Sequence, residues 1–290
     1  MPAIKQTAQL SIGRIVSLAC LLEICASKPG NVNRSADFED TTFNDFVVSS
    51  QLFGQAIDSR TTDELGLLIF NSVELTRSLV TVNTNLGIIM LIAPLAILAN
   101  DGDLSPIALR KLLKNTTPDD AANIYKAITL AGPGGLGRVD EMDVANEPPN
   151  EIMQAMKYSS DQDQIAQQYT NNFQQVFDDV VPLLEAGQQQ FESINEAIVY
   201  AHVSMLARYG DSLIKRKCGE DESNHARMLA CKALEGLVDK NLSNYHKATA
   251  ELDFWLRSDG NRRNPGATAD LVTAGIFTAI INENISAPFN

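Results

Sequence analysis

The sequence has little positive charge, only three histidines and no long hydrophobic run. Its 23 lysines and arginines are outnumbered by 36 aspartates and glutamates, so the formal net charge is −13. Such a surface repels phosphate backbones, which excludes non-specific binding to nucleic acids. An anionic ligand would therefore need a local basic pocket or a metal ion.

Cysteine is also scarce. Cys20, Cys25, Cys218 and Cys231 show no CxxC spacing and have no histidine at zinc-finger spacing. We therefore expect reduced thiols in a cytoplasmic protein. The longest apolar run, residues 86–99, is shorter than the ~20 residues that span a bilayer. The N-terminus lacks the basic region and cleavage site of a signal peptide, so we expect no membrane partner.

What the sequence has in abundance is helical periodicity, and almost no segment alternates as a strand does. The pattern predicts one all-α domain over residues 1–290, a bundle of about ten or more helices. The broadly apolar final helix suits either the core or a homodimer interface. The expected helices lie near 12–22, 62–80, 86–99, 105–114, 119–131, 150–159, 161–186, 190–217, 223–238, 241–257 and 267–284.

Two polar stretches flank apolar helices. In SKPGNVNR (27–34), Pro29 and Gly30 end a helix, because proline cannot continue it and glycine tolerates the turn. The remaining polar side chains form either a solvated turn or a ligand-binding loop. In VNTNLGII (82–89), Asn85 precedes the longest apolar helix, as a cap or as part of an anion site at the helix N-terminus.

A glycine-rich turn follows in AGPGGLGRVDEMD, which contains a literal G-x-G-x-x-G. We reject a dinucleotide site, because that motif needs a strand before it and a helix after it, whereas here a helix precedes it and a loop follows. Asp140 and Asp143 lie in this loop. Closely spaced carboxylates suit Mg²⁺, and an acidic surface loop is the equal alternative.

Residues 200–219 contain the densest basic cluster in the chain, Lys215 to Lys217. Cations at a helix C-terminus complement its dipole, and Gly219 stops the helix, so the cluster is either structural or a phosphate site. Arg208 and Asp211 are three residues apart, which places them on one side of the expected helix.

The stretch RSDGNRRNPGATADL (257–271) starts the final helix. We expect Asn264 at the N-cap and Pro265 at the first helical position. The amides near Gly266 would then be free to bind phosphate at the helix N-terminus. Asp270, in the first turn, either holds a metal or complements the helix dipole.

The order of these motifs resembles the triphosphoribosyl-dephospho-CoA synthase family over roughly residues 10–284. It runs KPGNVNR, then Asp40 and a Phe-containing helix, TNLG, a glycine turn, D-S-L-I-x-R-K-x-G and NPGATADL. The resemblance implies an all-α enzyme with ATP and 3′-dephospho-CoA as substrates and Mg²⁺ as the metal. The 2′-hydroxyl of dephospho-CoA would displace adenine at C1′ of the ATP ribose.

The resemblance also implies roles for individual residues. Asp40 and Asp211 match positions for a general base or metal ligand, and Asp270 is a further metal candidate beside Asp140 and Asp143. The candidates for binding phosphate, ribose or nucleotide are Lys28, Asn31, Asn33, Arg34, Asn85, Arg208, Arg216, Lys217, Asn264 and Gly266.

Four positions depart from the family pattern. Phe38 stands where the citrate-lyase type has histidine, Asn85 and Leu86 replace the His-Lys of T-H-K-G, and Cys218 replaces a glycine. These departures indicate a divergent branch and leave the acceptor open. The alternatives are a related ribosyl transfer or hydrolysis in another cofactor pathway, such as one-carbon cofactor assembly, or a non-catalytic nucleotide-binding protein.

Overall fold

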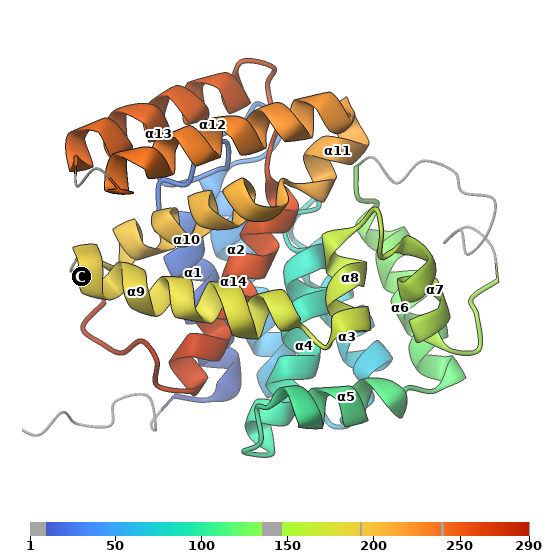
Figure 1. Cartoon of the computed structure of the whole chain (residues 1–290). Coiled ribbons are helices and arrows are strands. Elements are labelled where there is room, and N and C mark those ends of the chain that lie inside the picture. Colours follow the sequence, from blue (N-terminus) through green and yellow to red (C-terminus); the bar gives the residue numbers. More distant parts are fainter. Residues whose placement is uncertain (1–9, 135–146, 192, 239–240, 290) are drawn as a thin grey trace, which may run out of the picture.

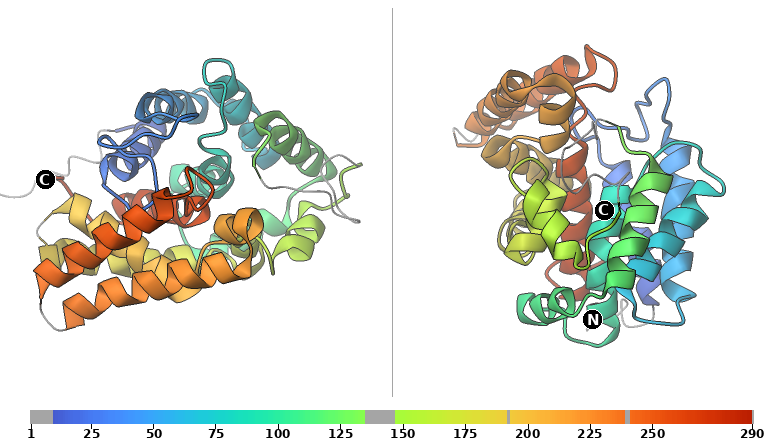
Figure 2. Two further views of the ribbon diagram at one scale, coloured as in Figure 1. Left: turned by 90° about the horizontal axis from the view of Figure 1, so that it is seen from above. Right: turned by 90° about the vertical axis from the view of Figure 1, so that its right-hand side faces the viewer.

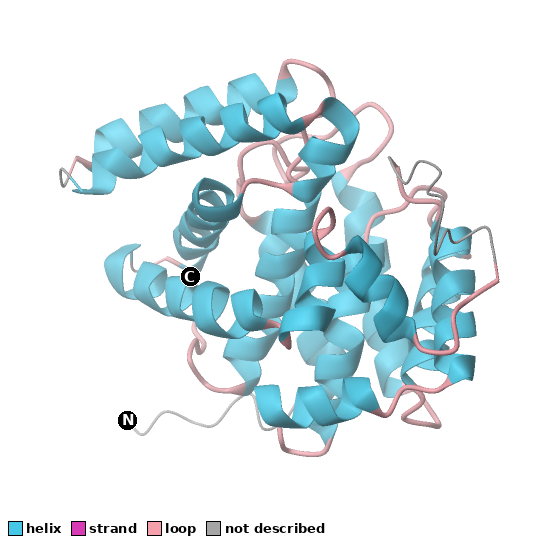
Figure 3. Ribbon diagram, turned by 45° about the vertical axis from the view of Figure 1, so that its right-hand side comes forward, coloured by secondary structure: helices cyan, strands magenta, loops and turns pink. Residues whose placement is uncertain are grey.

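The computed structural model describes residues 10–134, 147–191, 193–238 and 241–289. Within these ranges the chain forms fourteen α-helices, one π-helix and no β-sheet, which confirms the all-α prediction (Figure 3). The elements are α1 (Ile12–Cys25), α2 (Phe43–Asp58), α3 (Leu65–Arg77), α4 (Leu86–Asn100), α5 (Pro106–Lys114), α6 (Pro118–Ala131), α7 (Ile152–Ser159), α8 (Gln164–Asn171), η2 (Gln175–Val180), α9 (Val181–Phe191), α10 (Ile194–Tyr209), α11 (Ser212–Cys218), α12 (Glu220–Val238), α13 (Leu242–Arg257) and α14 (Gly266–Ile281).

The two most apolar helices, α4 and α14, form the centre of the molecule (Figure 1). Every residue from Leu271 to Ile280 is buried, and α14 packs against α1, α4, α9 and α10. Helix α14 therefore belongs to the core, whereas its sequence alone also allowed a place in a homodimer interface. One hydrophobic cluster extends from Ile15 to Ile285. No helix in the described ranges is long and apolar enough to cross a membrane.

Helices α12 and α13 form an antiparallel hairpin on one side of this core, packed through α12 against α10 (Figure 2). The hairpin leads back through residues 258–265 to the start of α14. Helix α13 thereby lies over the loop that follows α1, because Gly30 donates to Asp253 and Arg257 donates to the carbonyl of Asn31.

Two of the predicted helices are interrupted. The segment expected as one helix over 161–186 divides into α8, η2 and α9, because Asn172 and Phe173 have φ values of 59° and 60°. The segment expected over 190–217 breaks at Gly210, whose φ of 68° favours glycine. Asp211 then caps the new helix α11. Apolar periodicity continues across both breaks, so it could not reveal them.

Pro94 lies inside α4, where it has no amide to bond the carbonyl of Met90 four residues earlier. The hydroxyl of Tyr169 from α8 donates to that carbonyl instead, over 2.7 Å. Tyr169 is only 1% exposed, so neither group has water as an alternative partner. The proline thus creates a specific bond between α4 and α8.

Tyr169→Phe is expected to lower the free energy of unfolding by about 1–3 kcal/mol, because the buried Met90 carbonyl loses its donor. Urea denaturation measures this change. In a Pro94→Ala background the backbone amide at position 94 restores the helical bond to Met90, so the same substitution should cost clearly less. Equal costs in the two backgrounds would contradict this explanation.

Candidate active site

A cavity of about 890 Å³ opens between the central helix α4 and the group α6, α7, α8, α11 and α14. The loops at 38–41, 81–83 and 261–264 and the glycine turn at 132–134 complete its walls. This volume lies in the upper part of the range for small-molecule sites. The cavity therefore has room for a large nucleotide substrate.

The cavity concentrates charge of both signs within an acidic protein. Its charged lining residues are Arg77, Arg216, Lys217, Asp40, Asp163 and Asp270. Four of these six were site candidates from the sequence, and Asn264, another candidate, also lines the cavity. The cations supply the local basic pocket that an anionic ligand needs here.

Helix α11 presents one face to the cavity. Leu213, Arg216 and Lys217 are spaced i, i+3 and i+4, so their side chains share a side of the helix and all three line the cavity. Ile214, on another face, is fully buried. Within seven residues, the sequence D-S-L-I-x-R-K thus contains a helix cap, a core residue and three residues that line the cavity.

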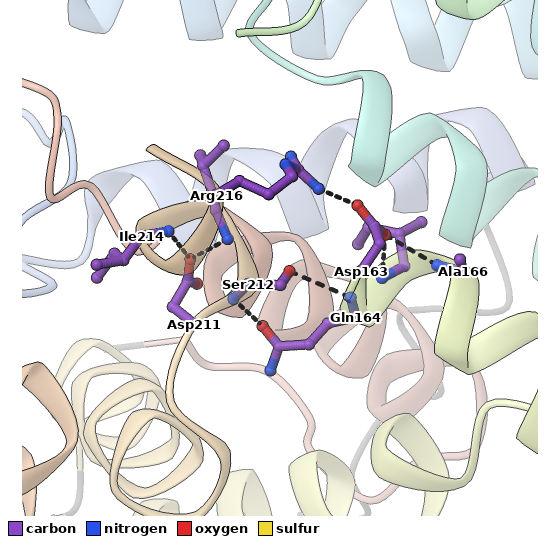
Figure 4. A network of polar contacts seen from close by, with 9 residues as sticks. Asp163, Gln164, Ala166, Asp211, Ser212, Ile214 and Arg216 are labelled. Carbon is purple, nitrogen blue, oxygen red and sulfur yellow. Dashed lines mark hydrogen bonds and ion pairs between the residues drawn. The ribbon is translucent and has the colours of Figure 1, made fainter. Parts of the chain in front are cut away.

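Asp211 caps α11 instead of facing the cavity (Figure 4). It is 1% exposed, and its carboxylate accepts from the amides of Leu213 and Ile214 and from both the amide and hydroxyl of Thr268, at 2.8–3.1 Å. Burial raises the pKa of the Asp211 carboxyl, and these four hydrogen bonds oppose the shift. Its geometry fits a structural link between α11 and α14, and it leaves no oxygen for the predicted base or metal role.

Arg216 is held at the cavity wall by Asp163, with which it forms an ion pair (Figure 4). Asp163 also caps α8, accepting from Ile165 and Ala166 at 2.8 and 3.0 Å. Nε of Arg216 is buried and has no partner among the described residues. The guanidinium is therefore oriented by Asp163 at the cavity wall, while its Nε is buried and unpaired within the described ranges.

Helices α8 and α11 are joined directly beside this ion pair. The amide of Gln164 donates to the hydroxyl of Ser212 at 3.1 Å, and the amide of Ser212 donates to the side-chain oxygen of Gln164 at 2.8 Å. Both residues are buried. This reciprocal bonding fixes the distance between the helices that carry Asp163 and Arg216 (Figure 4).

Lys217 and Asp40 lie at another part of the cavity, joined through Asn261. The Asn261 amide donates to both oxygens of Asp40, at 2.9 and 2.7 Å, and Lys217 Nζ donates to the Asn261 carbonyl at 3.4 Å. Burial lowers the pKa of Lys217, and the charge of Asp40 opposes that shift. This exposed carboxylate and partly buried ammonium form a polar rim.

Asp270 lies in the cavity beside the first turn of α4. A β-carbon at Gly87 would collide with its carboxylate, so glycine is required at position 87 for this approach. Among the described residues nothing hydrogen-bonds to that carboxylate. Burial first, and then the charges of Glu23, Asp211 and Asp163, raise the pKa of Asp270 well above its ordinary value. Without a ligand the neutral form of Asp270 is therefore favoured, and a cation beside it would favour the carboxylate.

The start of α14 differs by one residue from the prediction. Pro265 occupies the N-cap and Gly266 the first helical position, whereas the sequence suggested Asn264 and Pro265. The Gly266 amide donates to the Asn264 carbonyl at 2.9 Å and so is not free for phosphate, and the residue that lines the cavity is Ala267. The side-chain oxygen of Asn264 is buried without a partner among the described residues.

The loop KPGNVNR is mostly scaffold. Lys28 is fully buried, pairs with Glu23 at 3.1 Å and donates to the carbonyls of Glu23 and Ala26, so it closes the C-terminus of α1. Asn31 is buried beside His202, with 3.5 Å between Nδ2 and Nε2. Burial lowers the pKa of His202 to about 3, which keeps its ring neutral. Within residues 27–34 the cavity is lined by Val32 alone.

Four further candidates lie away from the cavity lining. Asn33 forms a local turn with Ser35, and Arg34 is exposed to solvent. Asn85 is 7% exposed, and its buried side-chain nitrogen lacks a partner among the described residues. Arg208 pairs with Asp179 at 2.6 Å on the surface, because the break at Gly210 separates it from Asp211.

Comparison with known proteins decides the family. A family model described as ATP:dephospho-CoA triphosphoribosyl transferase matches residues 9–289. The chain belongs to this family. Its members are transferases that use ATP and dephospho-CoA, so the family confirms the resemblance drawn from the motifs.

The fold of this transferase is similar to that of a solved protein. The crystal structure of a protein assigned as a triphosphoribosyl-dephospho-CoA synthase from Archaeoglobus fulgidus aligns with a TM-score of 0.63 and 22% identity. The alignment covers 81% of this chain and 96% of that one. At this identity the likeness concerns the fold. No curated protein matches the chain.

The transferase has no preformed metal cage among the described residues, where no three histidine, cysteine or acidic side chains are grouped to hold an ion. Asp140 and Asp143 lie outside the described ranges. The cavity instead offers single carboxylates, of which Asp270 is the least engaged. This arrangement fits Mg²⁺ that arrives on a triphosphate, because Mg²⁺ binds through one or two carboxylates plus substrate phosphates.

Sequence reasoning missed several polar residues of the transferase site, among them two charged ones and the amide that joins Asp40 to Lys217. Arg77 ends α3, Asp163 caps α8, and Asn261 lies in the loop before α14. Asp163 carried a usable signal, since an aspartate before an apolar periodic segment indicates an N-cap. Arg77 and Asn261 carried none, because only the tertiary fold brings them to the cavity.

Proposed function

We propose that this transferase joins the triphosphoribosyl group of ATP to 3′-dephospho-CoA inside the cavity described above. The 2′-hydroxyl oxygen of dephospho-CoA bonds to C1′ of the ATP ribose, and the C1′–N9 bond breaks. Adenine leaves with that electron pair and ends with the proton that the hydroxyl has lost. The products are triphosphoribosyl-dephospho-CoA and adenine, so atoms and charge balance.

The observation that carries this proposal is the set of three cations and three carboxylates around one cavity. ATP brings a triphosphate and dephospho-CoA a diphosphate, and both need cationic partners in a protein of net charge −13. Substitution at C1′ develops positive charge on the ribose, as in glycoside chemistry. Carboxylates near the ribose would stabilise that charge.

We assign a role to each side chain from its position at the cavity and from the hydrogen bonds that it already makes within the protein. Arg216 is oriented by Asp163 and lines the cavity, so we assign it to the triphosphate together with Lys217. Asp270 has free oxygens and is the candidate to meet Mg²⁺ on the triphosphate. Asp40 is the candidate to face the ribose or its hydroxyl proton, because it lines the cavity next to Lys217.

The whole chain acts as one domain in this proposal, because the cavity lining extends from Val32 to Asp270 and one hydrophobic cluster joins the helices that carry it. ATP and dephospho-CoA are also small soluble metabolites, which suits the cytoplasmic location expected from the sequence. The proposal does not require a second subunit.

The test is a mass-spectrometric assay of the purified protein with ATP, Mg²⁺ and 3′-dephospho-CoA. We expect free adenine and the triphosphoribosylated product in equal amounts, and loss of both when EDTA removes Mg²⁺. Adenine without the product would indicate hydrolysis, and absence of both in a protein that binds ATP would mean that the acceptor is different. A chain incubated without acceptor serves as the control.

A further inference from the structure

Among the described residues, the side of the cavity formed by α6 and α7 has no charged lining residue. The charged lining residues lie elsewhere: Arg77 on α3, Asp163 at the N-cap of α8, Arg216 and Lys217 on α11, Asp270 on α14, and Asp40 in the loop at 38–41. The α6–α7 wall is instead lined by Tyr125, Ile128, Ala131, Ile152, Ala155, Met156, Tyr158 and Ser159. The two helices lie together at one side of the molecule, beside α3 and α8 (Figure 1).

This wall is uncharged because α6 and α7 are rotated so that their lysines point away from the cavity. Lys126 and Lys157 are on α6 and α7, yet neither lines the cavity. Ile152, Ala155 and Met156 are at most 9% exposed, so their side chains form a packed apolar surface, and Tyr158, 47% exposed, stands at its edge. A ligand group that covers this wall must be uncharged and must gain from apolar contact.

We propose that the α6–α7 wall binds the pantetheine arm of the acceptor; this rests on the proposed function. Dephospho-CoA consists of an adenosine diphosphate and a long uncharged arm with methyl groups, amides and a thiol. The diphosphate requires the cationic side of the cavity, and the arm is the part of either substrate that is both long and free of charge. Methionine and isoleucine suit a flexible aliphatic chain, because they adapt their shape to it.

The competing occupant of this wall is the adenine ring of ATP. A purine is recognised by hydrogen bonds to its edge as well as by stacking, and the wall offers chiefly alkyl side chains. The methyl and methylene groups of the pantetheine arm fit these alkyl side chains better. The experiment separates the two occupants.

The probe is 4′-phosphopantetheine, which has the arm and one phosphate but no adenosine. We expect it to compete with 3′-dephospho-CoA and not with ATP in the wild-type enzyme. Tyr158→Glu places a charge at the edge of the wall without disturbing the core, and should raise the Kd of 4′-phosphopantetheine about tenfold while the Kd of ATP stays unchanged. Phe254→Glu is the matched control and should leave both constants unchanged, because Phe254 is 78% exposed on α13 and does not line the cavity.

Two results would overturn the proposal. The first is a wild-type enzyme that does not bind 4′-phosphopantetheine at millimolar concentration. The second is a Tyr158→Glu variant that binds ATP more weakly and 4′-phosphopantetheine normally, which would place adenine on the wall. Calorimetric binding needs no turnover, so an enzyme that binds 4′-phosphopantetheine but releases no adenine would contradict the proposed reaction and leave this subsite standing.

Discussion

Arg216→Met is expected to lower kcat/KM for ATP by about a hundredfold. The guanidinium is held at the cavity by Asp163, and removal of one preorganised donor at a reacting charged group costs about 10²–10³ in rate. Methionine keeps the alkyl contacts of the side chain and removes its charge. Steady-state kinetics with ATP varied at saturating 3′-dephospho-CoA measures the effect.

Arg208→Met is the matched control for this substitution. Arg208 lies eight residues earlier, pairs with Asp179 on the surface and does not line the cavity. We expect its kcat/KM to stay within about twofold of the wild type, because an exposed ion pair contributes little. Equal losses in the two variants would show that the chain needs total positive charge rather than a placed guanidinium.

Lys28→Met is expected to lower the free energy of unfolding by about 3–5 kcal/mol, because it leaves Glu23 as an unpaired carboxyl in the core. Burial already raises the pKa of Glu23, and Lys28 restrains that shift. Without Lys28 the folded protein takes up a proton at Glu23 more readily than the unfolded chain does. Its stability deficit should therefore be smaller at pH 5 than at pH 8 in chemical denaturation.

The double variant Glu23→Leu with Lys28→Met is the control. It removes both charges, and the carbonyls of Glu23 and Ala26 keep backbone partners at the amides of Ala26 and Lys28. A buried ion pair replaced by apolar residues is often neutral for stability, so most of the loss should be recovered. The folded double variant should also retain its KM for ATP. A large rise in the KM for ATP would indicate that Lys28 contributes to substrate binding and would contradict the structural role.

The fold was predictable because its signal is local. Apolar periodicity located most helices, including α4, α5, α6 and α13, within a few residues. It failed at Gly210 and at Asn172 and Phe173, where the backbone changes direction while the apolar pattern continues. A glycine before an aspartate carried the signal for the first break, but the second depends on two non-glycine residues at positive φ.

The site was predictable only in part, because a polar residue near a helix end has several possible uses. Arg216, Lys217 and Asp270 line the cavity as expected, and the spacing within α11 and α14 accounts for this. Asp211 and Lys28 have the same chemistry, yet the fold uses them as a cap and an ion-pair partner. Only the positions of Thr268 and Glu23 in space distinguish these cases.

The motif KPGNVNR shows why an ordered set of motifs can identify a family without showing which of its side chains reach the cavity. The loop is constrained by contacts over more than two hundred residues of sequence, from Gly30 to Asp253 and from Asn31 to Arg257. It also positions Phe38, over whose ring Arg257 lies at 5.3 Å, at the cavity. Its polar side chains thus lie outside the cavity lining, and its backbone is held by α13.

The most direct measurement is the position of ATP in a crystal of the enzyme grown with ATP and Mg²⁺ and without acceptor. We predict that the triphosphate lies within hydrogen-bonding distance of Arg216 and Lys217, with the metal ion next to Asp270. The α6–α7 wall should remain free of the nucleotide. ATP bound at the exposed Arg34, or anywhere outside the cavity, would contradict this account.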